Sequence, residues 1–361
     1  MGGLPSNTRF LHIGPHKTGT TAIQGAFNMA RSRLAEHGLT YVGKGRQPGK
    51  AAQQAAGRPP MFGAEHGSNH WQRLVGEVEA TGDQRAIISS EFFCESDDDA
   101  ARRIVEDLDA SRVHVVVTLR PLTKILSAQW QQYVQSGLRV SYEDWLDAVF
   151  NRPPEERPNP TFWRRHDQGE LVSRWAGIVG PENMTVIAVD DSDRGMLLRS
   201  FEELTDLPEG FLVPDDTQEN RSLSYGETEF LRRFNREFRS QDWDTLLYGR
   251  YIRRGAVRHM KVQYQPTREE AVIRTPEWAM ERAAKVGAES AATISTLGTR
   301  IMGDLGVLSD LPDNRVGDPG IPVLPPQAAA HAVFGAVAAG RDAEAAAKEA
   351  GESAAQKAAA A

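Results

Sequence analysis

The chain begins with a short apolar run that is followed by apolar residues at helical spacing. Thr8–Ile13 (TRFLHI) is largely apolar and ends at a glycine. After a polar loop, Ile23, Phe27, Ala30 and Leu34 are spaced four, three and four residues apart. A run of this length is typical of a buried strand, and the spacing places an apolar stripe along one helix face. The pattern therefore predicts a strand, a loop and a helix.

The same alternation continues through most of the chain. Further strands are predicted at residues 39–42, 86–90, 113–119 and 184–189, and helices near residues 71, 98, 122, 141, 171, 197 and 230. Continuously apolar strands that alternate with helices indicate a parallel sheet with both faces covered. We therefore expect a three-layer α/β fold, in which helices flank a parallel sheet, with a mostly helical C-terminal region.

Breaks in this pattern divide the chain. Residues Gly43–Asn69 are rich in Gly, Pro and Gln without periodicity, which predicts a long loop. Five prolines between residues 312 and 326 mark a linker, and an Ala-rich segment with helical propensity follows them. We expect one α/β domain over residues 1–311, with its core at about 9–240 and a helical region at 241–311. Residues 312–361 are then a linker and a helical tail.

Composition and charge exclude several classes of protein. Apolar residues make up 40% and charged residues 25%, as in globular proteins, and no apolar run approaches the ~20 residues that span a bilayer. Cys94 is the single cysteine, which excludes disulfide scaffolds and multi-cysteine metal sites, so we expect a reduced, cytoplasmic protein without membrane insertion. A formal net charge of −7 argues against nucleic-acid binding over a broad surface. A local cluster must therefore hold any bound anion.

A polar loop with two glycines follows the first predicted strand. Its sequence is Gly14-Pro15-His16-Lys17-Thr18-Gly19-Thr20-Thr21, and it leads into the first helix. Backbone N–H groups at such a helix start attract anions, Lys17 adds a positive charge, and the threonines add hydroxyl donors. The loop lacks the nucleoside-triphosphatase signature GxxxxGK[ST], because Lys17 comes two residues before Gly19. We interpret residues 14–21 as a phosphate cradle, with an ordinary turn and helix cap as the alternative.

The segment HIGPHKTGTTAIQ resembles the 5′-phosphosulfate loop of sulfotransferases that use 3′-phosphoadenosine 5′-phosphosulfate (PAPS). The resemblance is to P-loop sulfotransferases of the bacterial or carbohydrate type, and it implies a P-loop-type sheet. It also implies that Lys17 stabilises the leaving oxygen of the donor and that no metal is needed. The residues that would bind the 5′ phosphosulfate of PAPS are Pro15, His16, Lys17, Thr18, Gly19, Thr20 and Thr21.

A second segment, VHVVVTLRPLTKILSAQW, resembles the 3′-phosphate motif of the same family. In that motif an Arg at a strand end and a Ser about two helical turns later bind the 3′ phosphate of PAPS, which implies these roles for Arg120 and Ser127. Ser127 falls one position short of the usual spacing, where this chain has Ala128. The alternatives are a surface salt bridge for Arg120 and a helix-interior position for Ser127.

Transfer of a sulfuryl group to a hydroxyl or amine also needs a base for the acceptor proton. Glu91 follows a predicted strand, and it should therefore emerge at the same sheet edge as the cradle and Arg120. An equally open interpretation is that Glu91 only orients Lys17 or a helix N-terminus. His70 and His16 are rival bases, although His70 could cap or pack its helix and His16 could bind phosphate.

Two other function classes stay open. A kinase or nucleotide hydrolase would need magnesium, for which only Asp190 and Asp191 end a suitable strand. A non-catalytic phosphate-binding module would need the cradle but no base. The acceptor of a sulfotransferase would be a small molecule or a saccharide. Its pocket would be shaped by loop 43–69 and by the helical region after residue 240, with its basic run Arg250–Arg258. The tail could mediate an oligomer or contact a partner.

Overall fold

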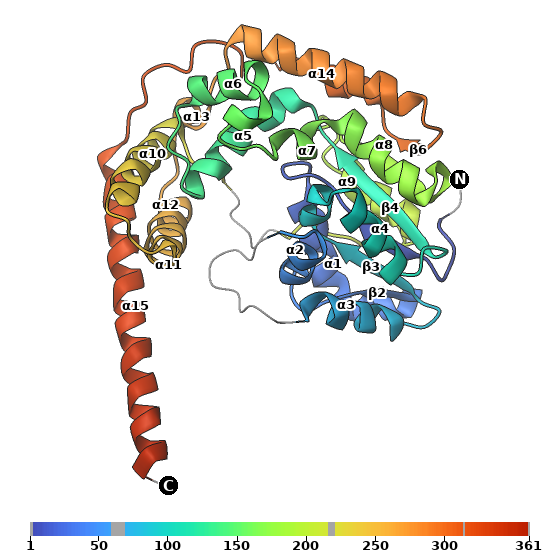
Figure 1. Cartoon of the computed structure of the whole chain (residues 1–361), viewed down its shortest axis with the longest axis horizontal. Coiled ribbons are helices and arrows are strands. Elements are labelled where there is room, and N and C mark those ends of the chain that lie inside the picture. The colour runs from blue at the N-terminus through green and yellow to red at the C-terminus, as the bar shows by residue number, and fades with distance from the viewer. Residues whose placement is uncertain (1–2, 59–68, 216–220, 313–314, 360–361) are drawn as a thin grey trace. The chain divides into compact units, whose positions relative to one another are not determined.

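The computed structural model describes residues 3–58, 69–215, 221–312 and 315–359, and the chain groups into two compact units (Figure 1). Unit 1 comprises Met1–Gln129, Asp147–Thr217 and Glu277–Val316, and unit 2 comprises Trp130–Leu146, Gln218–Pro276 and Gly317–Ala361. The proline-rich segment predicted a boundary between residues 311 and 312. The observed grouping assigns the tail to the same unit as two earlier segments, and it divides the chain inside two helices, α5 (Leu122–Gln135) and α6 (Tyr142–Asn151).

Unit 1 is built on a six-stranded parallel sheet with the strand order β2-β3-β1-β4-β5-β6. The strands are β1 (Arg9–His12), β2 (Leu39–Tyr41), β3 (Arg85–Ser89), β4 (Val113–Leu119), β5 (Met184–Ala188) and β6 (Arg300–Met302). The predicted α/β class with a parallel sheet is therefore confirmed. Strand β6 was not predicted, because it has only three residues and its central Ile301 is 38% exposed, so no apolar run marks it.

The helices of unit 1 lie between or after these strands. Their bounds are α1 (Thr20–Leu34), η1 (Ala35–His37), α2 (Gly49–Ala55), α3 (His70–Glu79), η2 (Glu91–Glu95), α4 (Asp98–Asp107), η3 (Pro154–Glu156), α7 (Phe162–His166), α8 (Gln168–Val179), η4 (Pro181–Asn183), α9 (Met196–Thr205), α14 (Glu277–Ser295) and η6 (Leu305–Ser309), where η marks a 3₁₀-helix.

Helix α2 lies within the segment 43–69 that was predicted to be a loop throughout, so the prediction is wrong for residues 49–55. Ala51, Ala52 and Ala55 of α2 are buried against the core of unit 1. Three alanines form a narrow apolar face that a search for large apolar residues at helical spacing does not detect. Residues 59–68 of the same segment lie outside the described residues.

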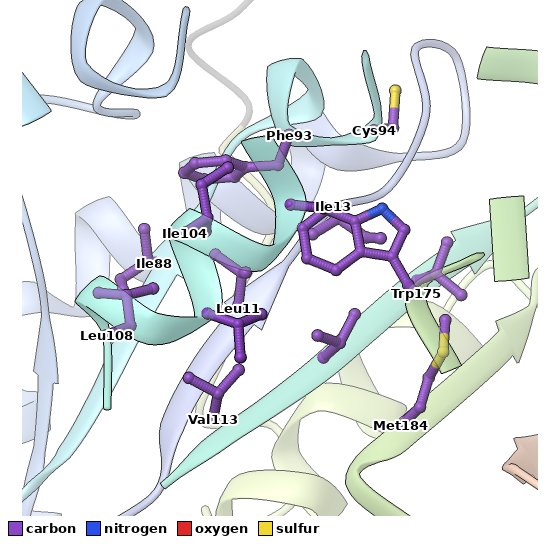
Figure 2. Close-up of a cluster of buried hydrophobic side chains, with 14 of the residues drawn as sticks. Leu11, Ile13, Ile88, Phe93, Cys94, Ile104, Leu108, Val113, Trp175 and Met184 are labelled. Atoms are coloured by element: carbon purple, nitrogen blue, oxygen red, sulfur yellow. The ribbon is translucent and has the colours of Figure 1, made fainter. Parts of the chain in front are cut away.

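Helices cover both faces of the sheet, because alternate residues of each strand point to opposite sides. On one face, Phe10 and Val116 pack with α1 and α9. On the other, Leu11 is in register with Ile88 of β3 and Val115 of β4, and this row packs with residues of α3, α4 and α8. Figure 2 shows this second cluster, in which side chains from the strands and from the helices above them converge. The central strands are therefore buried on both faces, and this packing holds in place the edge of the sheet at which their carboxyl ends lie.

Unit 2 is mostly helical, as predicted for the C-terminal region. Its helices are α10 (Tyr225–Ser240), α11 (Thr245–Leu247), the π-helix η5 (Tyr248–Val257), α12 (Arg258–Gln263), α13 (Arg268–Ala271) and α15 (Pro326–Ala359). The helix α15 forms at the predicted tail and packs against η5 and α12. Contact of this tail with a partner stays a prediction. No helix in the described residues is both long enough and apolar enough to cross a membrane.

Candidate functional site

The carboxyl ends of neighbouring strands bring several predicted residues to one edge of the sheet in unit 1. The adjacent strands β3, β1 and β4 are followed by Glu91, by the phosphate cradle and by Arg120. β5, beside β4, is followed by Asp190 and Asp191. Ligand sites in parallel α/β folds lie at this edge. The cradle, Glu91 and Arg120 therefore form one candidate site.

The phosphate cradle turns sharply before α1. Lys17 and Gly19 both have left-handed backbone conformations, with φ of 72° and 95°. Glycine adopts such angles readily, whereas lysine does so at a cost of about 1–2 kcal/mol. Backbone strain of this kind clusters at ligand sites. Gly19 is also the residue before the first turn of α1, and it caps that turn with no side chain. The conformation thus presents backbone N–H groups of the first turn in a way that suits an anion.

A chain of buried hydrogen bonds, here called the polar floor, lies beneath the cradle. It consists of Ser89, His12, Thr118, Thr18 and Pro15. Ser89 Oγ lies 2.8 Å from His12 Nδ1, and Thr118 Oγ1 lies 3.2 Å from His12 Nε2. Thr118 Oγ1 is 2.8 Å from Thr18 Oγ1, which donates to the Pro15 carbonyl at 2.8 Å. The polar floor therefore ties the cradle to three strands, β3, β1 and β4.

The chemistry of these groups fixes the direction of each hydrogen bond. The Pro15 carbonyl can only accept, so Thr18 donates to it and accepts from Thr118. Thr118 has then used its proton and must accept from Nε2 of His12, which therefore carries a hydrogen. Burial lowers the pKa of His12 to about 3, so the ring is neutral at pH 7. A neutral ring with its hydrogen on Nε2 leaves Nδ1 as an acceptor, so Ser89 donates to it.

Gly14 leaves the space that the polar floor occupies. A Cβ atom at residue 14 would collide with Thr118 Oγ1 and would lie 2.7 Å from His12 Nε2. Both atoms are held by hydrogen bonds inside the sheet, so neither can move aside without breaking the floor. The glycine is therefore required for its lack of a side chain.

The cradle threonines differ in their surroundings. The Thr18 hydroxyl belongs to the polar floor, and the Thr20 hydroxyl also donates to the Pro15 carbonyl, at 3.3 Å. Thr21 is exposed. The hydroxyl of Thr18 thus shapes the loop, and only its backbone N–H is left for the predicted contact with a donor. The donor contacts predicted for Thr20 and Thr21 stay predictions.

His16 is held by the buried carboxylate of Glu95, which was not among the predicted site residues. His16 Nε2 lies 3.2 Å from Glu95 Oε1. Glu95 also forms ion pairs with two arginines, from Oε1 to Arg165 Nε at 3.1 Å and from Oε2 to Arg58 Nε at 2.6 Å. Burial, the largest influence on the pKa of Glu95, raises it, but the hydrogen bond from His16 and the charges of Arg165 and Arg58 together outweigh burial and lower the pKa. An ionised carboxylate therefore connects the cradle to η2 and α7.

Two amide side chains hold Glu91. Gln24 of α1 donates to Glu91 Oε2 at 3.2 Å, and Gln47 donates to Glu91 Oε1 at 3.4 Å. Ser90 donates to the Gln47 amide oxygen at 3.1 Å, which fixes the orientation of that amide. Glu91 itself is half-buried. The carboxylate is thus positioned at the sheet edge by hydrogen bonds from neutral donors.

Arg120 lies against the cradle. Its Nη1 donates to the Lys17 carbonyl at 3.4 Å, and its own carbonyl accepts from Gln168 at 2.6 Å. The guanidinium also forms an ion pair with Asp191. The salt bridge considered as an alternative for Arg120 therefore exists, while its contact with the cradle keeps it beside the candidate site.

Ser127 and His70 are less closely connected to the cradle. Ser127 is buried on α5 at 6% exposure, whereas the neighbouring Ala128 is half-buried. His70 begins α3, whose first turn is anchored by hydrogen bonds of Trp71 to Gln54 and Asp107. Across the described residues, no hydrogen bond, ion pair or ring contact joins His70 to the cradle. The binding role of Ser127 and the catalytic role of His70 stay predictions.

The sequence does contain a signal for the polar floor. His12 and Thr118 are polar residues near the carboxyl ends of otherwise apolar strands. Buried polar groups need hydrogen-bond partners, so two such residues on adjacent parallel strands should pair. Glu95 carried no such signal, and Asp191 was considered only as a possible magnesium ligand, because nothing near either residue in the sequence indicates its distant cationic partners.

Comparisons with known proteins leave the family open. No protein-family model and no curated protein matches the sequence. Among solved structures, the chain is similar to the crystal structure of a sulfotransferase from Alicyclobacillus acidocaldarius, with 15% sequence identity and a TM-score of 0.42. The match covers 66% of this chain and 94% of that chain. A likeness this distant assigns no function.

Replacing Gly14 with alanine should disturb the polar floor. We expect Gly14→Ala to lower the free energy of unfolding by about 1–3 kcal/mol, because the new methyl group overpacks a fixed site. Gly76→Ala in α3 is the matched control, since a Cβ there meets nothing within 4 Å, and it should be neutral or stabilising. Urea denaturation measures both changes, and equal effects would contradict the steric argument.

The neutral state of His12 predicts a pH dependence. Below pH 6.5 the unfolded chain takes up a proton on this histidine that the folded chain does not take up until about pH 3, so folding stability falls with pH through this window. His12 should account for about 2 kcal/mol of the loss in unfolding free energy between pH 7 and pH 5.

The variant His12→Gln lacks this titration and tests its size. Its stability should fall about 2 kcal/mol less than that of the wild type over the same pH range. The loss that remains would include His114 and His166, whose pKa values burial also lowers. Denaturation curves at pH 7, 6 and 5 measure the difference, and parallel pH profiles for the two proteins would show that His12 is not neutral in the folded state.

Proposed function

We propose that the protein is a PAPS-dependent sulfotransferase that transfers a sulfuryl group to a hydroxyl or amine of a small-molecule or saccharide acceptor. The observation that carries this proposal is the order of β3, β1 and β4, because these adjacent strands are followed by the Glu91 carboxylate, the predicted phosphate cradle and the Arg120 guanidinium. A donor with one phosphosulfate and one separate phosphate needs two anion sites, and an acceptor needs a base beside them. The cradle, Arg120 and Glu91 meet these needs.

In this proposal the backbone of the cradle and Lys17 hold the 5′ phosphosulfate of PAPS, and Arg120 with Ser127 holds the 3′ phosphate. The donor supplies the sulfuryl group. The acceptor oxygen or nitrogen forms a bond to sulfur while the bond from sulfur to the bridging phosphate oxygen breaks, and that oxygen leaves with the electron pair. Lys17 stabilises the negative charge that develops there. The strained backbone of Lys17 suits a residue fixed in place for this role.

Glu91 is the proposed base, which takes the proton that the acceptor loses. Its two amide partners orient the carboxylate without adding a positive charge, which would make the carboxylate a weaker proton acceptor. His16 is a weaker candidate than Glu91, because its Nε2 is occupied by Glu95. His70 is weaker still, because its helix turn is anchored to other residues.

A kinase or nucleotide hydrolase is the alternative, with Asp190 or Asp191 as the magnesium ligand. Asp191 meets two cations, Arg120 and Lys124, and Asp190 accepts from the backbone N–H and the hydroxyl of Ser192 at 2.8 Å each. Neither carboxylate is arranged as an open metal ligand. Within the described residues, no group of three or more His, Cys, Asp and Glu side chains could hold a metal ion.

Ligand binding separates these functions. Adenosine 3′,5′-bisphosphate should raise the melting temperature more than ADP or ATP with magnesium, because only the former offers a 3′ phosphate to Arg120. At about one hundred times its Kd it should add about 2.7 kcal/mol to the free energy of unfolding. Differential scanning fluorimetry measures the shift.

A pair of variants controls this experiment. Arg120→Gln should remove the preference for the 3′-phosphorylated nucleotide, whereas Arg102→Gln, which changes an exposed residue of α4, should keep it. Stabilisation by ATP with magnesium that equals or exceeds that by adenosine 3′,5′-bisphosphate would favour the kinase alternative.

Substitution of Glu91 separates an enzyme from a binding module. Glu91→Gln keeps the shape of the side chain and removes the proton acceptor, so we expect sulfuryl transfer from labelled PAPS to fall by about 10²–10⁴. Binding of adenosine 3′,5′-bisphosphate should be unchanged or tighter, because a negative charge near the phosphates is lost. Glu106→Gln on α4 is the control and should keep full activity. Full activity in Glu91→Gln would move the role of base to His16 or His70.

A further inference from the structure

Asp191 gathers two cations at the carboxyl edge of β4 and β5. Arg120 donates from Nε to Asp191 Oδ2 at 3.1 Å and from Nη2 to Asp191 Oδ1, so it binds both carboxylate oxygens. Lys124 Nζ lies 3.1 Å from the same Oδ2 atom. The side chains of Arg120, Asp191 and Lys124 are 34%, 30% and 23% exposed. These three residues, here called the Asp191 cluster, are therefore fixed relative to one another yet open to solvent.

The carboxylate is what allows Arg120 and Lys124 to lie so close together. Two positive charges that share one oxygen atom repel each other, and this repulsion is offset only by a negative charge between them. Burial, the largest influence on the pKa of Asp191, raises it, but the hydrogen bond and charge of Arg120 and those of Lys124 outweigh burial and lower the pKa. Asp191 is thus ionised at neutral pH, and the cluster keeps one net positive charge.

The ion pair uses only part of the hydrogen-bonding capacity of the two cations. A guanidinium has five N–H donors, of which Asp191 takes two and the Lys17 carbonyl takes one. The two that remain belong to Nη1 and Nη2, the pair of atoms that can bind two oxygens of one phosphate. The Lys124 ammonium has three donors and gives one to Asp191. The cluster therefore holds Arg120 by one edge and leaves donors for an anion.

The neighbouring Asp190 gives a matched comparison. It follows the same strand and carries the same charge, but its carboxylate accepts hydrogen bonds from Ser192 and belongs to a tight turn. Of these two aspartates, Asp191 is the one that forms an ion pair with Arg120. A substitution at residue 190 thus changes the net charge at this edge of the sheet without removing the partner of Arg120 and Lys124.

We propose that Asp191 is a positioning residue, which holds Arg120 and Lys124 together as one binding site for the 3′ phosphate of the donor and so sets the preference for 3′-phosphorylated nucleotides. This inference rests on the proposed function and extends it to two residues, Asp191 and Lys124. An arginine that is already held loses little side-chain freedom when it binds a phosphate. Asp191 therefore strengthens selection of this phosphate although it is itself an anion.

The test compares the affinities of two nucleotides that differ only in the 3′ phosphate. Calorimetry gives the Kd of adenosine 3′,5′-bisphosphate and of AMP for the wild type, Asp191→Asn, Asp191→Glu, Asp190→Asn and Lys124→Gln, at about 0.15 M and about 0.5 M salt. The measured quantity is the selectivity, defined as the Kd of AMP divided by that of adenosine 3′,5′-bisphosphate. High salt screens the electrostatic effect of removing a charge.

We expect Asp191→Asn to lower the selectivity about tenfold at the higher salt concentration, and Lys124→Gln to lower it about fivefold. Asp191→Glu should restore part of the loss, and Asp190→Asn should stay within about twofold of the wild type. A selectivity that rises in Asp191→Asn at low salt and returns to the wild-type value at high salt would mean that the residue only repels anions, and this overturns the proposal. Unchanged selectivity in both Asp191→Asn and Lys124→Gln overturns it as well.

The wild-type protein distinguishes failure of this inference from failure of the proposed function. If the wild type binds AMP as tightly as adenosine 3′,5′-bisphosphate, the 3′-phosphate site and the proposed function both fail. If the wild type prefers the bisphosphate and the Asp191 variants do so equally, only the positioning role fails. Thermal unfolding of each variant without ligand checks that the fold is kept.

Discussion

The polar floor is the constraint on which the rest of the site depends. A histidine and three hydroxyls sit where the sheet would otherwise be filled by apolar side chains, and each proton in the chain has one allowed direction. An unpaired polar group at this depth costs about 1–3 kcal/mol, so the five groups are ordered together or not at all. The loop above them takes its shape from this order. Residue 14 must be a glycine because the hydroxyl of Thr118 occupies the place where a Cβ atom would lie.

The fold could be predicted from the sequence because its main elements each carry a local pattern. Strands β1, β3, β4 and β5 are buried on both faces and appear as apolar runs, and α1 shows its stripe of apolar residues. The elements that were missed have no such pattern. β6 is a short edge strand with an exposed centre, and α2 is buried through alanines. The division into two units was also invisible, because it depends on contacts between distant segments.

The candidate site was predictable only where a motif is contiguous. The cradle, Glu91 and Arg120 each follow a strand, and parallel topology places such residues at one edge. The residues that hold them are remote in sequence: His12 pairs with Ser89 and Thr118 across 77 and 106 positions, and Asp191 is 71 positions from Arg120. No local pattern links such pairs. A single sequence therefore locates the candidate ligand-binding groups more readily than the residues that orient them.

The order of the strands has a consequence for synthesis of the chain. The cradle leaves the ribosome before Thr118, on which its floor depends, and strand β6 of the same sheet follows much later, at Arg300–Met302. Until β4 emerges, Thr18 lacks the hydrogen bond from Thr118, so the polar floor is incomplete. Long-range pairing of this kind slows folding, because the chain loses the entropy of loop closure before the stabilising contacts between distant strands form. A nascent chain that lacks β4 therefore cannot complete the polar floor, and the cradle takes its final shape only after β4 has joined the sheet.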